Sequence, residues 1–109
     1  MLWKCTVCSY YHKGDAAPDK CPKCGAPAEK FVALSDADAQ KVFMSERTND
    51  IHMEIMGLTM KIVELSKEGI DLDLDPPCVA LFEDAIEEAL VIKNRCRAEL
   101  ETHMQRGKF

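Results

Sequence analysis

The stretch WKCTVCSYYHKGDAAPDKCPKCG, residues 3–25, holds four of the six cysteines in the chain. They form two Cys-x-x-Cys pairs, Cys5 with Cys8 and Cys21 with Cys24, with twelve residues between the pairs. In such a pair a tight turn aims two sulfurs at one point, and two facing pairs make a tetrahedral cage. This spacing predicts that all four cysteines are ligands of one metal ion.

The identity of the metal is left open by the ligands themselves, because four thiolates suit both zinc and iron. The residues within the second pair support a rigid turn. Pro22 is expected to stiffen it, and Gly25 can supply the positive φ that the chain needs just after the last cysteine.

The bulk composition is that of a soluble globular protein, with 30% charged and 47% hydrophobic residues. No apolar run approaches the roughly 18 residues needed to span a membrane. The N-terminal residues MLWKC lack the apolar core of a signal peptide. We therefore expect a cytoplasmic protein with no membrane partner, in which thiols stay reduced and disulfides are not formed.

The net charge of −5 is unevenly distributed. Residues 1–34 carry five lysines and three acidic residues, whereas residues 35–109 carry nine basic and sixteen acidic residues. Nucleic-acid binding requires a surface rich in Lys and Arg. The acidic second part of the chain therefore argues against a nucleic-acid partner.

Residues 1–34 are predicted to form a small β/loop module. They are rich in glycine and proline, and short strands are expected at residues 2–4 and 29–32. A segment of this length cannot bury a self-sufficient hydrophobic core, so it needs a metal or another cross-link.

Residues 35–109 are predicted to form an all-α antiparallel hairpin. Ser35, followed three residues later by Asp38, resembles a capping box that opens a helix over 36–68, closed by Gly69. Residues 45–50 are weak helix formers at which this helix could kink. Asp75 and Pro76 predict the start of a second helix that runs to about residue 105.

The apolar residues of both helices recur at spacings of three and four, which predicts a seam between the helices. The expected seam residues of the first helix are Met44, Thr48, Ile51, Ile55, Leu58, Ile62 and Leu65. Those of the second helix are Val79, Phe82, Ile86, Ala89, Lys93, Cys96 and Leu100.

A further stripe on the first helix lies about 160° from this seam. Its residues are Met53, Met56, Met60 and Val63. One neighbouring helix cannot cover both stripes, so the methionine stripe predicts a homodimer in which two hairpins form a four-helix bundle. Docking of the N-terminal module on the same stripe is the alternative.

The residues around the cysteines carry a more specific signal. They include Trp3, Tyr10, a Gly-Asp-x-Ala-Pro turn at 14–18, the Cys-Pro-x-Cys-Gly-Ala segment at 21–26, and Lys30 followed by Phe31. In these features residues 3–31 resemble the rubredoxin-like domain that closes rubrerythrins. Ser9 departs from the pattern, because the family usually has glycine after the first cysteine pair.

This resemblance implies an Fe(Cys)4 centre that cycles between Fe3+ and Fe2+ and exchanges one electron with a redox partner protein. It also implies that Cys8 and Cys24 lie nearest the solvent, and that Trp3, Tyr10 and Phe31 form a small aromatic core. The alternative is a zinc ribbon that serves as a structural or interaction module.

Rubrerythrins also carry a di-iron four-helix domain, which needs Glu-x-x-His motifs. This sequence has none; its nearest pairing is Glu99 with His103, four residues apart. A di-iron, ferritin-like oxidoreductase assembled in a dimer is therefore the second alternative. The function predicted first is an electron carrier and not an enzyme, with His52 and His103 as ordinary helix residues.

Cys78 and Cys96 lie outside the two pairs. They are eighteen residues apart on one predicted helix, about 27 Å at 1.5 Å per residue, which is too far for a disulfide. Cys96 is expected to be a small core residue. Cys78 lies near a helix N-terminus, where the helix dipole is expected to favour a thiolate.

Overall fold

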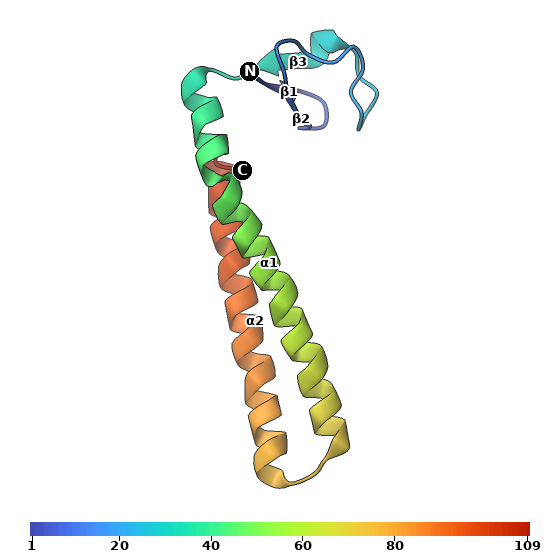
Figure 1. The fold of residues 1–109 in the computed structure, drawn as a ribbon, viewed down its shortest axis with the longest axis vertical. Helices are drawn as coiled ribbons and strands as arrows, with labels where there is room; N and C mark the ends of the chain where they lie inside the picture. The colour runs from blue at the N-terminus through green and yellow to red at the C-terminus, as the bar shows by residue number, and fades with distance from the viewer. The chain divides into compact units, whose positions relative to one another are not determined.

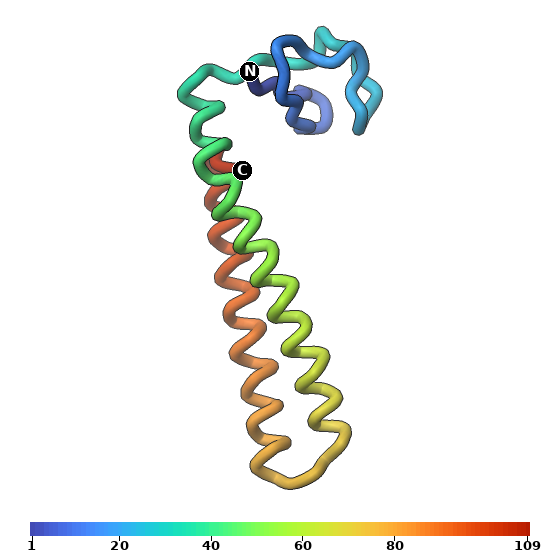
Figure 2. The backbone as a smooth tube through the Cα atoms, in the orientation of Figure 1, coloured from blue at the N-terminus to red at the C-terminus, as the bar shows by residue number.

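The computed structural model describes residues 1–109, which form two compact units, Met1–Met44 and Ser45–Phe109. Three short strands come first and two long helices follow (Figures 1 and 2). A small strand module followed by a helical hairpin is the fold class predicted from the sequence. None of the helices combines the length and the apolar character required to cross a membrane.

The first unit contains a three-stranded antiparallel sheet in the order β2-β1-β3. The strands are β1 (Leu2–Cys5), β2 (Tyr11–Lys13) and β3 (Phe31–Ala33), and a 3-10 helix, η1 (Ala28–Lys30), leads into β3. The central strand β1 pairs Trp3 with His12 on one side and with Ala33 on the other. Strands β1 and β3 overlap the predicted ones. The three-residue β2 is too short to show a pattern of alternation.

The core of this unit is small and is centred on the cysteines. Cys5, Cys21 and Phe31 are buried, and Trp3 and Tyr10 pack against them. The indole Nε1 of Trp3 donates a hydrogen bond to the Gly14 carbonyl at 3.2 Å. The aromatic core implied by the family resemblance is therefore present.

Helices α1 (Asp36–Leu72) and α2 (Pro76–Gln105) begin as predicted. The Ser35 hydroxyl accepts a hydrogen bond from the Asp38 N–H at 3.2 Å, and the Asp75 carboxylate accepts one from the Cys78 N–H at 2.9 Å. Each bond satisfies an N–H group that has no partner within its helix.

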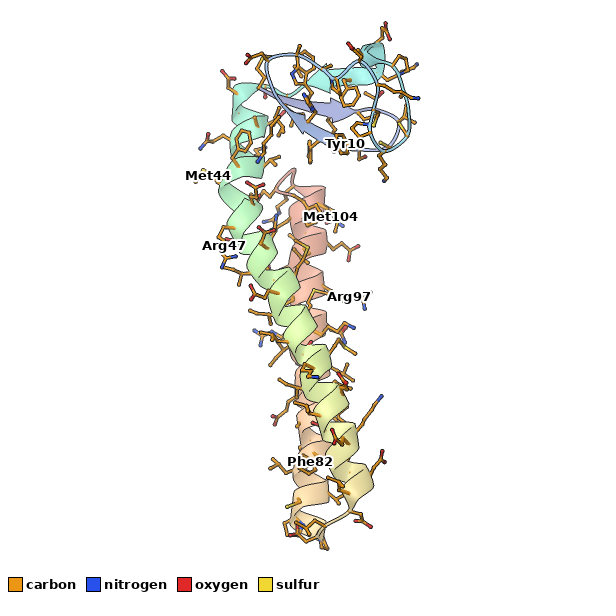
Figure 3. The ribbon with its side chains drawn as sticks, turned by 45° about the vertical axis from the view of Figure 1, so that its right-hand side comes forward. Tyr10, Met44, Arg47, Phe82, Arg97 and Met104 are labelled. Atoms are coloured by element: carbon orange, nitrogen blue, oxygen red, sulfur yellow. The ribbon has the colours of Figure 1, made fainter.

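The end of α1 differs from the prediction. The helix passes through residues 45–50 without a break and continues beyond Gly69 to Leu72. Gly69 has a different role, because a Cβ atom at this position would collide with the ring of Phe82 on α2. The glycine therefore permits a close approach of the two helices near the loop, where Figure 3 labels Phe82.

The predicted seam of α2 is confirmed. Ala89, Cys96 and Leu100 are buried, and the remaining predicted residues are half-buried: Val79, Phe82, Ile86 and Lys93.

The predicted seam of α1 is wrong by one residue, which is a rotation of about 100°. Met44, Leu58 and Leu65 are 73%, 59% and 53% exposed. The residues that face α2 each follow a predicted one directly: Ser45, Asn49, His52, Met56, Thr59, Val63 and Ser66. Most of them are small or polar, so hydrophobicity did not reveal them.

The polar groups at the end of this seam have partners. The Ser45 hydroxyl and the Asn49 amide both donate to the Lys108 carbonyl, at 2.5 and 2.7 Å. The methionine stripe also needs correction, because Val63 is buried and Met56 is half-buried inside the hairpin seam. It is therefore not a separate surface.

Candidate metal centre

The first cysteine pair lies in a tight turn that follows β1. The Cys5 N–H donates to the Tyr10 carbonyl at 2.9 Å, and the Ser9 N–H donates to the Cys5 carbonyl at 3.0 Å. These two bonds close the loop around Cys8 and hold both sulfurs on one side of it.

The second pair repeats the same turn. The Cys21 N–H donates to the Ala26 carbonyl at 2.8 Å, and the Gly25 N–H donates to the Cys21 carbonyl at 2.9 Å. An isolated antiparallel bridge between Lys20 and Pro27 supports the base of the turn. The two pairs are thus equivalent knuckles with matching hydrogen bonds.

Both knuckles need a left-handed residue after their second cysteine. The φ angles are 67° at Ser9 and 76° at Gly25. This confirms the conformation predicted for Gly25, and it shows that Ser9 adopts the backbone that the family usually gives to glycine. A non-glycine residue there costs about 1 kcal/mol.

The four sulfurs converge, with all Sγ atoms within 4.8 Å of one another. The Sγ atoms of Cys5 and Cys24 are 3.7 Å apart, and those of Cys8 and Cys21 are 3.6 Å apart. A tetrahedral ion with metal–sulfur bonds of about 2.3 Å requires sulfur–sulfur distances of about 3.8 Å. All six cysteines are free thiols, so the cluster suits a single metal ion.

The two cysteines of each knuckle differ in exposure. Cys5 and Cys21 are buried, whereas Cys8 is half-buried and Cys24 is exposed. The second cysteine of each pair therefore lies nearer the solvent, as the family resemblance implied.

Backbone N–H groups aim at the buried sulfurs and favour thiolates there. At Cys21, burial acts to raise the pKa, but the N–H groups of Cys24 and Lys23 and the neighbouring thiols outweigh it and lower the pKa to about 6. Burial is likewise outweighed by backbone donors at Cys5, whose pKa is lowered.

The exposed thiol behaves in the opposite way. At Cys24 the Ala26 N–H acts to lower the pKa, but burial and the other three sulfurs outweigh it and raise the pKa to about 12. Four negative sulfurs repel one another at this distance, so the last proton leaves only when a cation arrives. The site is chemically prepared for a metal.

The thiols outside the cluster are in different surroundings. Cys96 is 7% exposed in the α2 seam, as expected for a small core residue. The expectation of a thiolate at Cys78 is wrong, because a hydrogen bond to Asp75, burial and the Asp75 charge raise its pKa. The carboxylate of Asp75, which caps the helix, disfavours a thiolate at Cys78 more strongly than the helix dipole favours one.

The two helix histidines meet inside the hairpin, which the sequence pattern did not indicate. The rings of His52 and His103 are arranged edge to face with centroids 6.2 Å apart, and His103 Nδ1 lies 2.6 Å from the Asn49 side-chain oxygen. Neither histidine belongs to a cluster of metal-ligating side chains. The four cysteines are the one cluster of at least three His, Cys, Asp or Glu side chains whose ligand atoms lie within 4.8 Å of one another.

A three-stranded module with two equivalent knuckles and four converging sulfurs defines a rubredoxin-like metal domain. Residues 3–32 match the family described as "Rubrerythrin, rubredoxin-like domain". The resemblance found in the sequence is thereby confirmed for the N-terminal module.

A particular relative supports the same conclusion. The chain is similar to Reverse rubrerythrin-1 of Clostridium acetobutylicum, with 47% identity over 45 residues that cover 37% of this chain and 25% of the relative. The match thus spans about a quarter of the length of that protein. No solved structure matches the chain significantly.

Proposed function

We propose that the N-terminal module is a one-electron carrier whose four clustered cysteines hold a single iron ion. Bound iron would supply a couple between Fe3+ and Fe2+. The observation that carries this proposal is the convergence of the four sulfurs, all within 4.8 Å of one another, in a domain that matches the rubrerythrin rubredoxin-like family.

The protein groups around the sulfurs suit this role. Cys5 and Cys21 are buried against Phe31, so water is kept from the inner side of the cage. Backbone N–H groups directed at the sulfurs stabilise negative charge, and such donors tune the potential of an iron–sulfur centre. The paired knuckles fix the sulfur positions, so little rearrangement is needed when the charge of the centre changes.

The exposed side of the cage is where a partner can approach. Cys24 brings one ligand sulfur to the surface, and Val7 in the first knuckle is 61% exposed. We expect a redox partner protein to dock on this side, in a cytoplasmic setting that keeps the thiols reduced.

The proposal is tested on the full chain reconstituted with ferrous iron and oxidised in air. We expect one iron per chain and a red ferric-thiolate absorption that dithionite bleaches. Cys8→Ser should lose this absorption, whereas Cys78→Ser removes a thiol outside the cluster and should retain it.

Two outcomes would contradict the proposal. A chain that rejects iron and holds only zinc would be a structural or interaction module. More than one tightly bound iron per chain, with the excess retained in Cys8→Ser, would favour the di-iron oxidoreductase assembled in a dimer.

A further inference from the structure

The hairpin leaves a long apolar stripe of α1 uncovered. The stripe residues each precede a residue of the α1 seam by one position. They are Thr48, Ile51, Ile55, Leu58, Ile62 and Leu65, and the five apolar ones are 36–59% exposed. We call this surface the Ile/Leu face. Its spacing alternates between three and four residues, as in a helix that packs against another helix.

Helix α2 adds to the same face. Its residues one position before the seam are Leu81, Ala85, Glu88, Ile92, Arg95 and Glu99. Because α2 runs antiparallel to α1, these positions lie on the same side of the hairpin as the α1 stripe. A groove of about 200 Å³ agrees with this placement, since His52 of α1 and Ile92, Arg95 and Glu99 of α2 line it.

The hairpin buries few large apolar side chains of its own. In the Ser45–Phe109 unit the buried hydrophobic residues are Val63, Ala89, Cys96 and Leu100, while Leu58 and Leu65 remain more than half exposed. Contiguous apolar patches above a few hundred Å² mark interaction sites. Five large apolar side chains are exposed along four turns of one helix, so this face is a candidate interface.

We propose that a second copy of this chain covers the Ile/Leu face. Its α1 lies antiparallel against α1 of the first copy, and the two-fold axis passes close to Leu58. Leu58 then meets Leu58 of the second copy, Ile55 meets Ile62, and Ile51 meets Leu65. A two-fold interface must be self-complementary, and this stripe is nearly so. Ile51 and Leu65 each lie seven residues from Leu58, and Ile55 and Ile62 lie three and four residues from it.

Charges beside the stripe favour the same register. Arg47, Glu54, Lys61 and Glu68 follow one another at intervals of seven residues with alternating sign. In the proposed register Glu54 lies opposite Lys61 of the second copy, and Arg47 lies opposite Glu68. Figure 3 shows Arg47 projecting outward from α1. Lys61 also pairs with Glu64 of its own helix at 3.5 Å, an exposed and weak contact.

Helix α2 is compatible with this axis. Glu88 and Arg95 have opposite charges and are seven residues apart. When Ile92 meets Ile92 of the second copy, Glu88 of one copy lies opposite Arg95 of the other. Lys93 donates to the Met60 sulfur at 3.1 Å, which places the middle parts of α1 and α2 at a similar height. One axis can therefore relate both helices, giving a four-helix bundle.

The opposite face of the hairpin is a poorer candidate. Its α1 positions, one after the seam, are Glu46, Asp50, Met53, Gly57, Met60 and Glu64, so charges and a glycine interrupt its apolar residues. Helix α2 contributes charged residues to both faces, so the difference lies in α1, where no charge interrupts the Ile/Leu face. We therefore place the second copy on the Ile/Leu face and not on the side of the methionines.

Light scattering of the full chain tests the assembly, and we expect twice the chain mass of 12.3 kDa. Ile62→Lys should shift the protein to monomer. Met53→Lys is the matched control on the other face, because Met53 is 45% and Ile62 43% exposed. A monomeric wild-type chain, or a monomer caused by Met53→Lys and not by Ile62→Lys, would overturn the proposal.

Charge exchange tests the register. Lys61→Glu or Glu54→Lys alone places like charges together twice per dimer and should weaken association roughly ten-fold. The double exchange should restore it, and about 1 M salt should remove the differences. If the double variant is weaker than either single one, the antiparallel α1 pairing is wrong.

Two controls keep these outcomes interpretable. Far-ultraviolet circular dichroism should report the same helix content in each variant, so that a loss of mass is a loss of association and not of the helices. The iron content and red absorption of the N-terminal module should be unchanged in all of them. A failure of the dimer would therefore leave the electron-carrier proposal unaffected.

Discussion

Ser9 carries the main local backbone strain of the metal module, because its φ of 67° belongs to a region that side chains disfavour. The equivalent position in the second knuckle is Gly25, which tolerates this conformation without cost. The hydrogen bond from the Ser9 N–H to the Cys5 carbonyl holds the turn closed despite the strain. The two knuckles therefore have the same shape but different intrinsic stability.

Exchange at these two positions should have opposite effects. Ser9→Gly should stabilise the metal-loaded module by about 0.5–1 kcal/mol, since relief of strain exceeds the added freedom of the unfolded chain. Gly25→Ala should destabilise it by about 1 kcal/mol. The rate of metal loss to a chelator measures both. Equal rates of metal loss for wild type and Ser9→Gly would show that Ser9 is not strained in the turn in solution.

The four cysteines and the residues after them could be identified from the sequence, because each knuckle is local and its spacing is set by one turn. The behaviour of Cys78 could not be predicted in the same way. The pKa of its thiol is raised by Asp75. The sequence predicts Asp75 as the helix cap, but it does not indicate that the same carboxylate acts on the neighbouring sulfur. The helix dipole alone pointed in the wrong direction.

At the scale of elements, Gly69 shows that a glycine near a helix end need not terminate it. Helix α1 continues for three residues beyond Gly69, and the absent side chain makes room for the Phe82 ring. At Gly57, in the middle of the same helix, a Cβ would meet no atom within 4 Å apart from the adjacent backbone of its own helix. The two glycines therefore differ in packing although both are helical.

Alanine substitution should separate these two roles. Gly57→Ala should stabilise the hairpin by about 1 kcal/mol through helix propensity alone. Gly69→Ala gains the same propensity, but the collision with Phe82 should cost about 1–3 kcal/mol. We therefore expect no stabilisation, and a net destabilisation of up to about 2 kcal/mol. Denaturant unfolding followed by circular dichroism measures both. Stabilisation by Gly69→Ala would show that the helices separate easily near the loop.

The seam of α1 marks the limit of sequence patterns at this scale. Apolar periodicity correctly located the α2 seam, since Ala89, Cys96 and Leu100 are both regular and buried. On α1 the strongest periodicity belongs to the Ile/Leu face, whereas the seam contains Ser45 and Asn49, whose side chains bond the Lys108 carbonyl. A hydrophobic pattern reports that a surface is to be covered, but it does not say by which helix.

At the scale of the whole chain, the two units are stabilised by different means. The Met1–Met44 unit has its core around Cys5, Cys21 and Phe31, two of which are proposed metal ligands. The Ser45–Phe109 unit is held by helix packing and by polar contacts such as that between His103 and Asn49. Metal binding is therefore expected to contribute to the folding of the first unit only.

Removal of the metal should unfold the module and leave the hairpin folded. The only tryptophan of the chain, Trp3, lies in the module and packs against its core, so its fluorescence reports this unit. Circular dichroism reports mainly the helices, because α1 and α2 hold most of the regular structure. After chelation, or in the variant with Cys5→Ser and Cys21→Ser, we expect Trp3 emission to shift to the red while helix content and assembly mass persist. Simultaneous loss of both signals would mean that the metal stabilises the entire chain as one cooperative unit.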